Sequence, residues 1–112
     1  KTQFDILQVT RNNVIAEIKN ISNDQLNYIP EGFNNNIVWN VAHLIATQQL
    51  LVYGLSKTPF VVPKSIIDDN RKGTKPSTYY SQIDTKEMIE YLTTTVNQME
   101  IDYNNKAIST SA

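Results

Sequence analysis

The amino-acid sequence predicts an all-α fold with three long helices, over about residues 3–21, 36–55 and 85–103. In each of these segments apolar residues recur every three or four positions, which is the spacing of one helix face. Residues that cap or break helices stand at the ends of the segments. With 112 residues the chain can hold one domain, covering 1–112, and it can bury a sizeable core.

The composition excludes several classes of function. The chain carries 10 basic and 11 acidic residues without a basic stripe, so a nucleic-acid partner is not expected. Only Arg11 and Arg71 could bind a phosphate or carboxylate through two parallel hydrogen bonds. The absence of cysteine excludes disulfides and thiolate sites. Polar residues interrupt every apolar run, so we expect no membrane span and a cytoplasmic protein.

The first predicted helix has one apolar face and a clear start. Its face consists of Phe4, Leu7, Val14, Ile15, Ile18 and Ile21. Thr2 can cap the start, and Arg11 is expected off the apolar face. The following Ser22 and Gln25 match a capping box, which predicts a single helical turn over 23–27.

The second predicted helix is apolar on more than one face. Three asparagines, at 34–36, offer N-caps, and Gly54 and Pro59 stop the helix near residue 55. A helix that is apolar on most faces is buried by two or more neighbours. This helix is therefore expected at the centre of a bundle or in a dimer interface.

A long polar connection over residues 57–84 leads to the third helix. Within it, residues 65–70 are expected to form a short helical turn. Asp84 and Glu87 are expected to cap the third helix, whose apolar face is regular up to Tyr103. Such a long connection is typical of a crossing at the end of a bundle.

His43 is the only histidine and the strongest candidate for chemistry. Its expected neighbours on the same helix face, which would line a pocket, are Asn36, Trp39, Asn40 and Thr47. The opposite, structural face would consist of Ile37, Val41, Leu44, Ile45 and Val52. The residues leave two interpretations open: a ligand or metal site, or a buried histidine bonded to a carbonyl or an asparagine. No acidic residue stands three or four positions from His43, so the metal motif is incomplete.

The run Asn-Asn-Ile-Val-Trp-Asn-Val-Ala-His-Leu at 35–44 resembles the second-helix signature of the DinB-like (YfiT-like) superfamily. Gln-Gln-Leu at 48–50 and Tyr-Gly-Leu-Ser at 53–56 continue this resemblance to the second-helix signature. Lys-Gly-Thr-Lys-Pro at 72–76 resembles the loop between the second and third helices of its small bacterial members. The resemblance implies a four-helix bundle of up-down-down-up course, often a homodimer. It also implies a divalent metal, zinc or nickel, held by three histidines, of which one matches His43.

In that family the other two histidines form a His-x-x-x-His pair on a fourth helix, which the given sequence does not contain. The resemblance implies a metal-dependent enzyme of thiol-transferase or hydrolase-like chemistry, whose substrate and catalytic residues stay unassigned. The alternative is a non-catalytic helical module that binds a small ligand or partner and dimerises through the helix over 36–55.

Overall fold

The computed structural model describes residues 2–108, and over these residues the protein is all-α, as predicted. Its order is α1 (Gln3–Ile18), α2 (Asn23–Asn27), α3 (Ile37–Gln49), the π-helix η1 (Leu50–Gly54), α4 (Lys64–Asn70) and α5 (Gln82–Asn104). None of the described helices is both long and apolar enough to cross a membrane.

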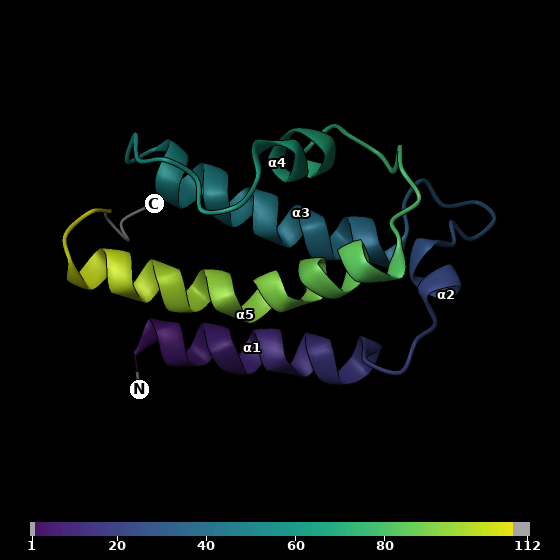
Figure 1. Cartoon of the computed structure of the whole chain (residues 1–112), viewed down its shortest axis with the longest axis horizontal. Helices are drawn as coiled ribbons and strands as arrows, with labels where there is room; N and C mark the ends of the chain where they lie inside the picture. Colours follow the sequence, from purple (N-terminus) through teal and green to yellow (C-terminus); the bar gives the residue numbers. More distant parts are fainter. Residues whose placement is uncertain (1, 109–112) are drawn as a thin grey trace.

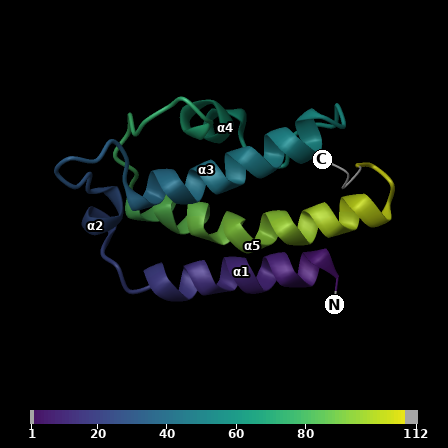
Figure 2. The same cartoon turned by 180° about the vertical axis from the view of Figure 1, so that it is seen from behind.

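The three long helices lie side by side, with α5 between α1 and α3 (Figures 1 and 2). The helix α1 runs opposite to α3 and α5, which share one direction, so their course is up-down-down. The short helix α4 lies on α3, on the side away from α1. The arrangement agrees with the predicted DinB-like bundle, and α3 packs against both α4 and α5.

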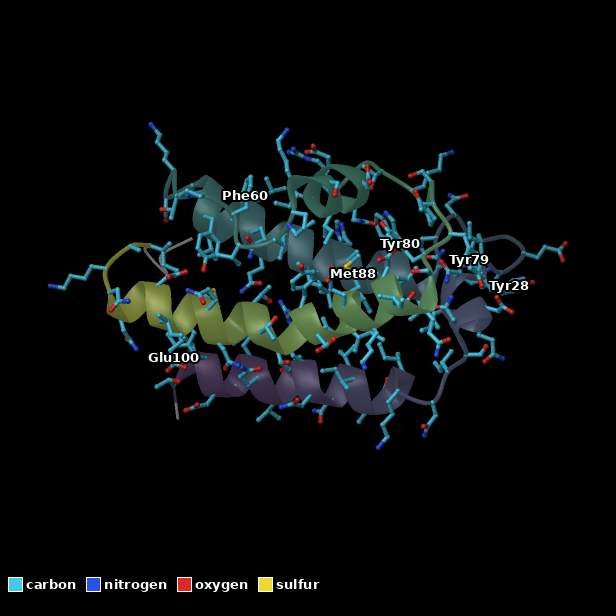
Figure 3. All side chains as sticks on the ribbon, viewed as in Figure 1. Tyr28, Phe60, Tyr79, Tyr80, Met88 and Glu100 are labelled. Carbon is cyan, nitrogen blue, oxygen red and sulfur yellow. The ribbon has the colours of Figure 1, made fainter. Side chains whose placement is uncertain are left out.

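The core fills the space between α3, α4 and α5. Its fully enclosed side chains include Ile45 of α3, Ile67 of α4 and Leu92 of α5. Met88 lies between α3 and α5, and Phe60 packs beside the end of the helix that follows α3 (Figure 3). Burying an aliphatic side chain of this size contributes about 1.5–3 kcal/mol, so these contacts are the main source of stability.

Side-chain caps begin four helices, and three of these starts agree with the sequence predictions. Thr2, Ser22 and Asn36 accept hydrogen bonds from the third residue beyond each of them. The expected cap of the last long helix is wrong. Ser81 caps α5 by accepting from the Asp84 backbone nitrogen at 3.1 Å, so the helix begins at Gln82 and Asp84 lies in its first turn. The first helix also ends at Ile18, three residues earlier than predicted.

A buried amide network ties the connections to the start of α3. The side chain of Asn27 accepts from the Tyr80 backbone nitrogen at 2.9 Å and donates to the Tyr80 carbonyl at 3.1 Å. The carbonyl of Asn27 accepts from the Asn36 side chain at 2.9 Å. These bonds join α2 and the start of α3 to the segment before α5, which is distant in the sequence, and they satisfy backbone groups that burial would leave without water.

The π-helix η1 continues α3 and brings Tyr53 into the interior. Tyr53 is fully buried, and its hydroxyl donates to Asp102 Oδ2 at 2.5 Å. The second carboxylate oxygen of Asp102 accepts from Gln98 at 3.0 Å. Burial first, then the hydrogen bond to Asp102 and its negative charge, raise the pKa of the Tyr53 hydroxyl well above its ordinary value.

We expect Tyr53→Phe to lower the free energy of unfolding by about 1–3 kcal/mol at neutral pH, because a hydrogen bond to a charged group is lost. Native Tyr53 keeps its proton above pH 10, where the unfolded chain releases it, so this stabilisation falls as pH rises above about 10. Urea unfolding at pH 7 and at about pH 11 measures both effects. The control is Tyr28→Phe, since Tyr28 is exposed. A constant difference between wild type and Tyr53→Phe across this range would contradict the assignment.

Candidate functional site

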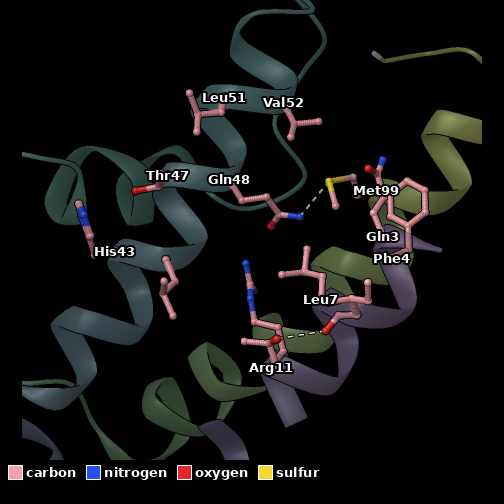
Figure 4. A pocket seen from close by; sticks show the side chains of 13 residues that line it. Gln3, Phe4, Leu7, Arg11, His43, Thr47, Gln48, Leu51, Val52 and Met99 are labelled. Carbon is pink, nitrogen blue, oxygen red and sulfur yellow. Dashed lines mark hydrogen bonds between the residues drawn. The ribbon is translucent and has the colours of Figure 1, made fainter. Parts of the chain in front are cut away.

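A cavity of about 640 Å³ lies between α1 and α3, and Met99 in the C-terminal part of α5 lines it. Figure 4 shows its walls, with Leu7 and Arg11 of α1 facing His43, Thr47 and Gln48 of α3 and Met99 of α5. Most of the lining is apolar. The cavity exists because α1 and α3 both pack on α5, which holds them apart.

The apolar residues at the edge of this cavity are exposed. Ile6 of α1 is 59% exposed, and Leu44 and Leu51 on the opposite side are 43% and 49% exposed. Leu44, expected on the structural face of its helix, lies instead at the edge of the cavity, so this prediction is wrong. Val41 and Ile45 are buried as expected. Leu44 precedes Ile45 by one residue, which rotates its side chain by about 100° around the helix axis and toward the cavity.

The ring of His43 is held on one side by an aromatic face and on one edge by a carbonyl. It stacks on Trp39 with 4.6 Å between ring centroids and 9° between planes. Its Nδ1 lies 2.7 Å from the carbonyl oxygen of Asn70, at the end of α4. Because a carbonyl only accepts, Nδ1 carries a proton in this contact, and a neutral ring then has a free electron pair on Nε2.

The connection after α4 fixes the aromatic partner of His43. Trp39 Nε1 donates to Thr74 Oγ1 at 3.1 Å, and Thr74 donates to the Arg71 carbonyl at 2.7 Å. The indole is therefore held by packing and by a hydrogen bond, and it restricts the imidazole that lies against it. The orientation of His43 depends on the last residue of α4 and on the connection that follows α4.

The four expected pocket residues separate in space. Thr47 lines the 640 Å³ cavity with His43, and Asn40 lines a second cavity, of about 410 Å³, with His43. Trp39 lies against the His43 ring. Asn36 is buried in the amide network, where it caps α3 through the Trp39 nitrogen at 2.8 Å.

Two further polar residues of the cavity escaped the sequence analysis. Arg11, expected off the apolar face, is only 5% exposed, and its Nη1 donates to the Leu92 carbonyl at 2.9 Å. Its position four residues after Leu7 and three before Val14 places it within the apolar stripe. Gln48 is also buried, as one of two adjacent glutamines that precede the π-helix. Helical spacing places both side chains on buried faces of their helices. Arginine and glutamine are mostly exposed residue types, so their burial was not predicted.

The donor set for a metal is incomplete over residues 2–108. These residues contain no group of three histidine, cysteine, aspartate or glutamate side chains that could hold an ion. His43 alone has the geometry of a ligand, with its second nitrogen held by a carbonyl as in many metal sites. The described part of the chain therefore fits one position of a metal site and no more.

The fold and the site define a helical bundle with a cavity lined by histidine and arginine. The DinB superfamily model matches residues 6–105, and the chain belongs to that superfamily. No curated protein and no solved structure gave a significant match.

We expect metal-free protein at mildly alkaline pH to hold the His43 proton on Nδ1, because the Asn70 carbonyl accepts it. Long-range ¹⁵N–¹H correlation spectra of labelled protein distinguish the two neutral tautomers. A proton on Nε2 would contradict the contact with Asn70, since Nδ1 would then carry a lone pair facing the carbonyl oxygen.

Proposed function

We propose that the protein is a metal-dependent enzyme of the DinB superfamily and that His43 is one of its metal ligands. The observation that carries the proposal is the hydrogen bond from Nδ1 to the Asn70 carbonyl, which leaves Nε2 free. Family membership over residues 6–105 supports it. The other ligands would come from outside residues 2–108, and zinc or nickel is the proposed ion.

Each residue around His43 would have a defined task. The Asn70 carbonyl orients the ring and makes Nε2 a better electron donor, while Trp39 blocks rotation of the ring. The apolar walls of the cavity would bind the body of a substrate and lower the local dielectric constant. A bound divalent ion acts as a Lewis acid on a thiol or a water molecule, which accords with thiol-transfer or hydrolytic chemistry.

A second candidate function is a non-catalytic module that dimerises through α3. The exposed apolar residues at the edge of the cavity favour it, because Ile6, Leu44 and Leu51 form a face that another surface could cover. The two functions are compatible, since an enzyme of this kind can also be a homodimer.

We expect full-length protein to bind Zn²⁺ or Ni²⁺ and to melt at a higher temperature when the ion is added, because binding to the native state stabilises it. His43→Ala should weaken binding at least tenfold, since the ligand itself is removed. Calorimetric titration and thermal unfolding measure these effects.

The matched control for this titration is Thr94→Ala on the exposed face of α5, which should bind metal as wild type does. Equal affinity of wild type and His43→Ala would exclude His43 as a ligand. Absence of any binding to the full-length wild type would exclude the metal-dependent function.

We expect the chain to form a homodimer in sedimentation experiments, with a total buried area of roughly 1,600 Å² if the interface is of standard size. Leu51→Glu should favour the monomer, because it places a charge on the exposed apolar face of α3 and η1. Ile83→Glu is the control, since Ile83 is 81% exposed on α5 and does not line the cavity. A monomer at all accessible concentrations would count against the second function.

A further inference from the structure

Among residues 2–108, no acidic side chain forms an ion pair with the buried cation Arg11. Within this described part of the chain, Arg11 is the only permanently ionised residue in the lining of the 640 Å³ cavity, and the lining contains no aspartate or glutamate. The ion pair between Lys64 and Asp68 lies on α4, and neither residue lines this cavity. The bond from Nη1 to the Leu92 carbonyl uses one of the five N–H donors of the guanidinium.

Burying the Arg11 guanidinium without a bound anion costs free energy, because the charged group loses hydration. Burial lowers the pKa of the guanidinium, which indicates that the charged form loses hydration without an anion to replace it. A carboxylate that accepts two parallel hydrogen bonds is the best match for the remaining donors. A bound anion at this position would therefore be held by charge and by geometry.

Gln48 supplies a second unsatisfied group in the same cavity. Its Oε1 is buried and has no hydrogen-bond partner. Its Nε2 donates to the Thr95 carbonyl over a long 3.4 Å and to Met99 Sδ, a weak acceptor, at 3.4 Å. Figure 4 shows the Gln48 amide and the Arg11 guanidinium pointing toward one another across the cavity. A buried acceptor without a donor loses its hydration without compensation, and the hydroxyl of a ligand would satisfy it.

We propose that Arg11 binds the carboxylate of a small, largely apolar hydroxy acid in the cavity between α1 and α3, with Gln48 accepting from its hydroxyl. A monoanion fits better than a phosphate monoester, because over residues 2–108 the lining offers a single permanent cation, Arg11. The apolar body of the acid would lie against residues such as Leu7, Leu44 and Leu51.

This proposal rests on the proposed enzymatic function and gives it a substrate class. Arg11 and His43 line the same cavity, on opposite helices. An acid anchored by its carboxylate at Arg11 would extend the rest of its chain along the cavity, whose lining includes His43. Arg11 is a binding residue in this arrangement and sets specificity for acids.

The test titrates the protein with 2-hydroxyhexanoate and with the neutral 2-hydroxyhexanamide, and it follows the Arg11 Nε–H resonance by NMR. The acid should bind wild type at least tenfold more tightly than the amide, the affinity ratio expected for a charge-assisted pair. Arg11→Met should abolish this preference. Arg71→Met, at the only other arginine, removes the same charge from an exposed site and should preserve it.

Equal binding of acid and amide by wild type would overturn the proposal without any variant. It would also be overturned if the acid leaves the Arg11 resonance unchanged, the result expected when a carboxylate of the protein already occupies the guanidinium. Thermal unfolding of Arg11→Met confirms that this variant is folded. Metal titration of the same proteins separates the two proposals, since Arg11→Met should bind Zn²⁺ as wild type does and His43→Ala should keep its preference for the acid.

Discussion

The structure depends on the packing of α3 against α4 and α5. Ala42 and Ala46 have no exposed surface, and their small side chains allow the neighbouring helices to approach closely. Ile45 is also fully buried and packs in the core between α3 and these neighbouring helices. Since this packing uses two sides of α3, its remaining side, with Leu44 and Thr47, faces the cavity. One helix thus supplies both the centre of the core and one wall of the site.

The same packing orients the candidate ligand. The last residue of α4, Asn70, is buried, and its side chain donates to the Ile66 carbonyl at 2.8 Å, which fixes the end of that helix. A helix end leaves carbonyl groups without an intrahelical donor, and the carbonyl of Asn70 meets His43 Nδ1. The imidazole therefore satisfies a backbone acceptor while the acceptor fixes the imidazole. A structural role and a ligand role for His43 require the same contact, so the two interpretations of the sequence are not exclusive.

The sequence predicted the helices better than it predicted the site, and the reason is physical. Apolar spacing and local caps such as Thr2 and Asn36 act between residues three or four apart, so they are visible in the sequence. The cap at Ser81 was missed because two acceptors, three residues apart, compete for one helix start. The partners of His43 and Trp39 come from Asn70 and Thr74, at 27 and 35 residues' separation, and no local pattern contains such contacts.

Three buried polar side chains, Arg11, Gln48 and Gln49, each have a polar group that the fold leaves without a partner over residues 2–108. Gln49 Oε1 accepts from the Val61 nitrogen at 2.9 Å and fixes the chain after η1, while its Nε2 has no partner over residues 2–108. Arg11 joins α1 to the Leu92 carbonyl of α5, but over the same residues its other guanidinium donors lack a protein partner, as does Gln48 Oε1, and these two side chains line the cavity. An apolar side chain of similar size at either position would remove a desolvation penalty, and such replacements commonly stabilise proteins. Retaining Arg11 and Gln48 in the lining of one cavity therefore accords with the proposed polar ligand better than with a purely structural role, and His43 lines the same cavity.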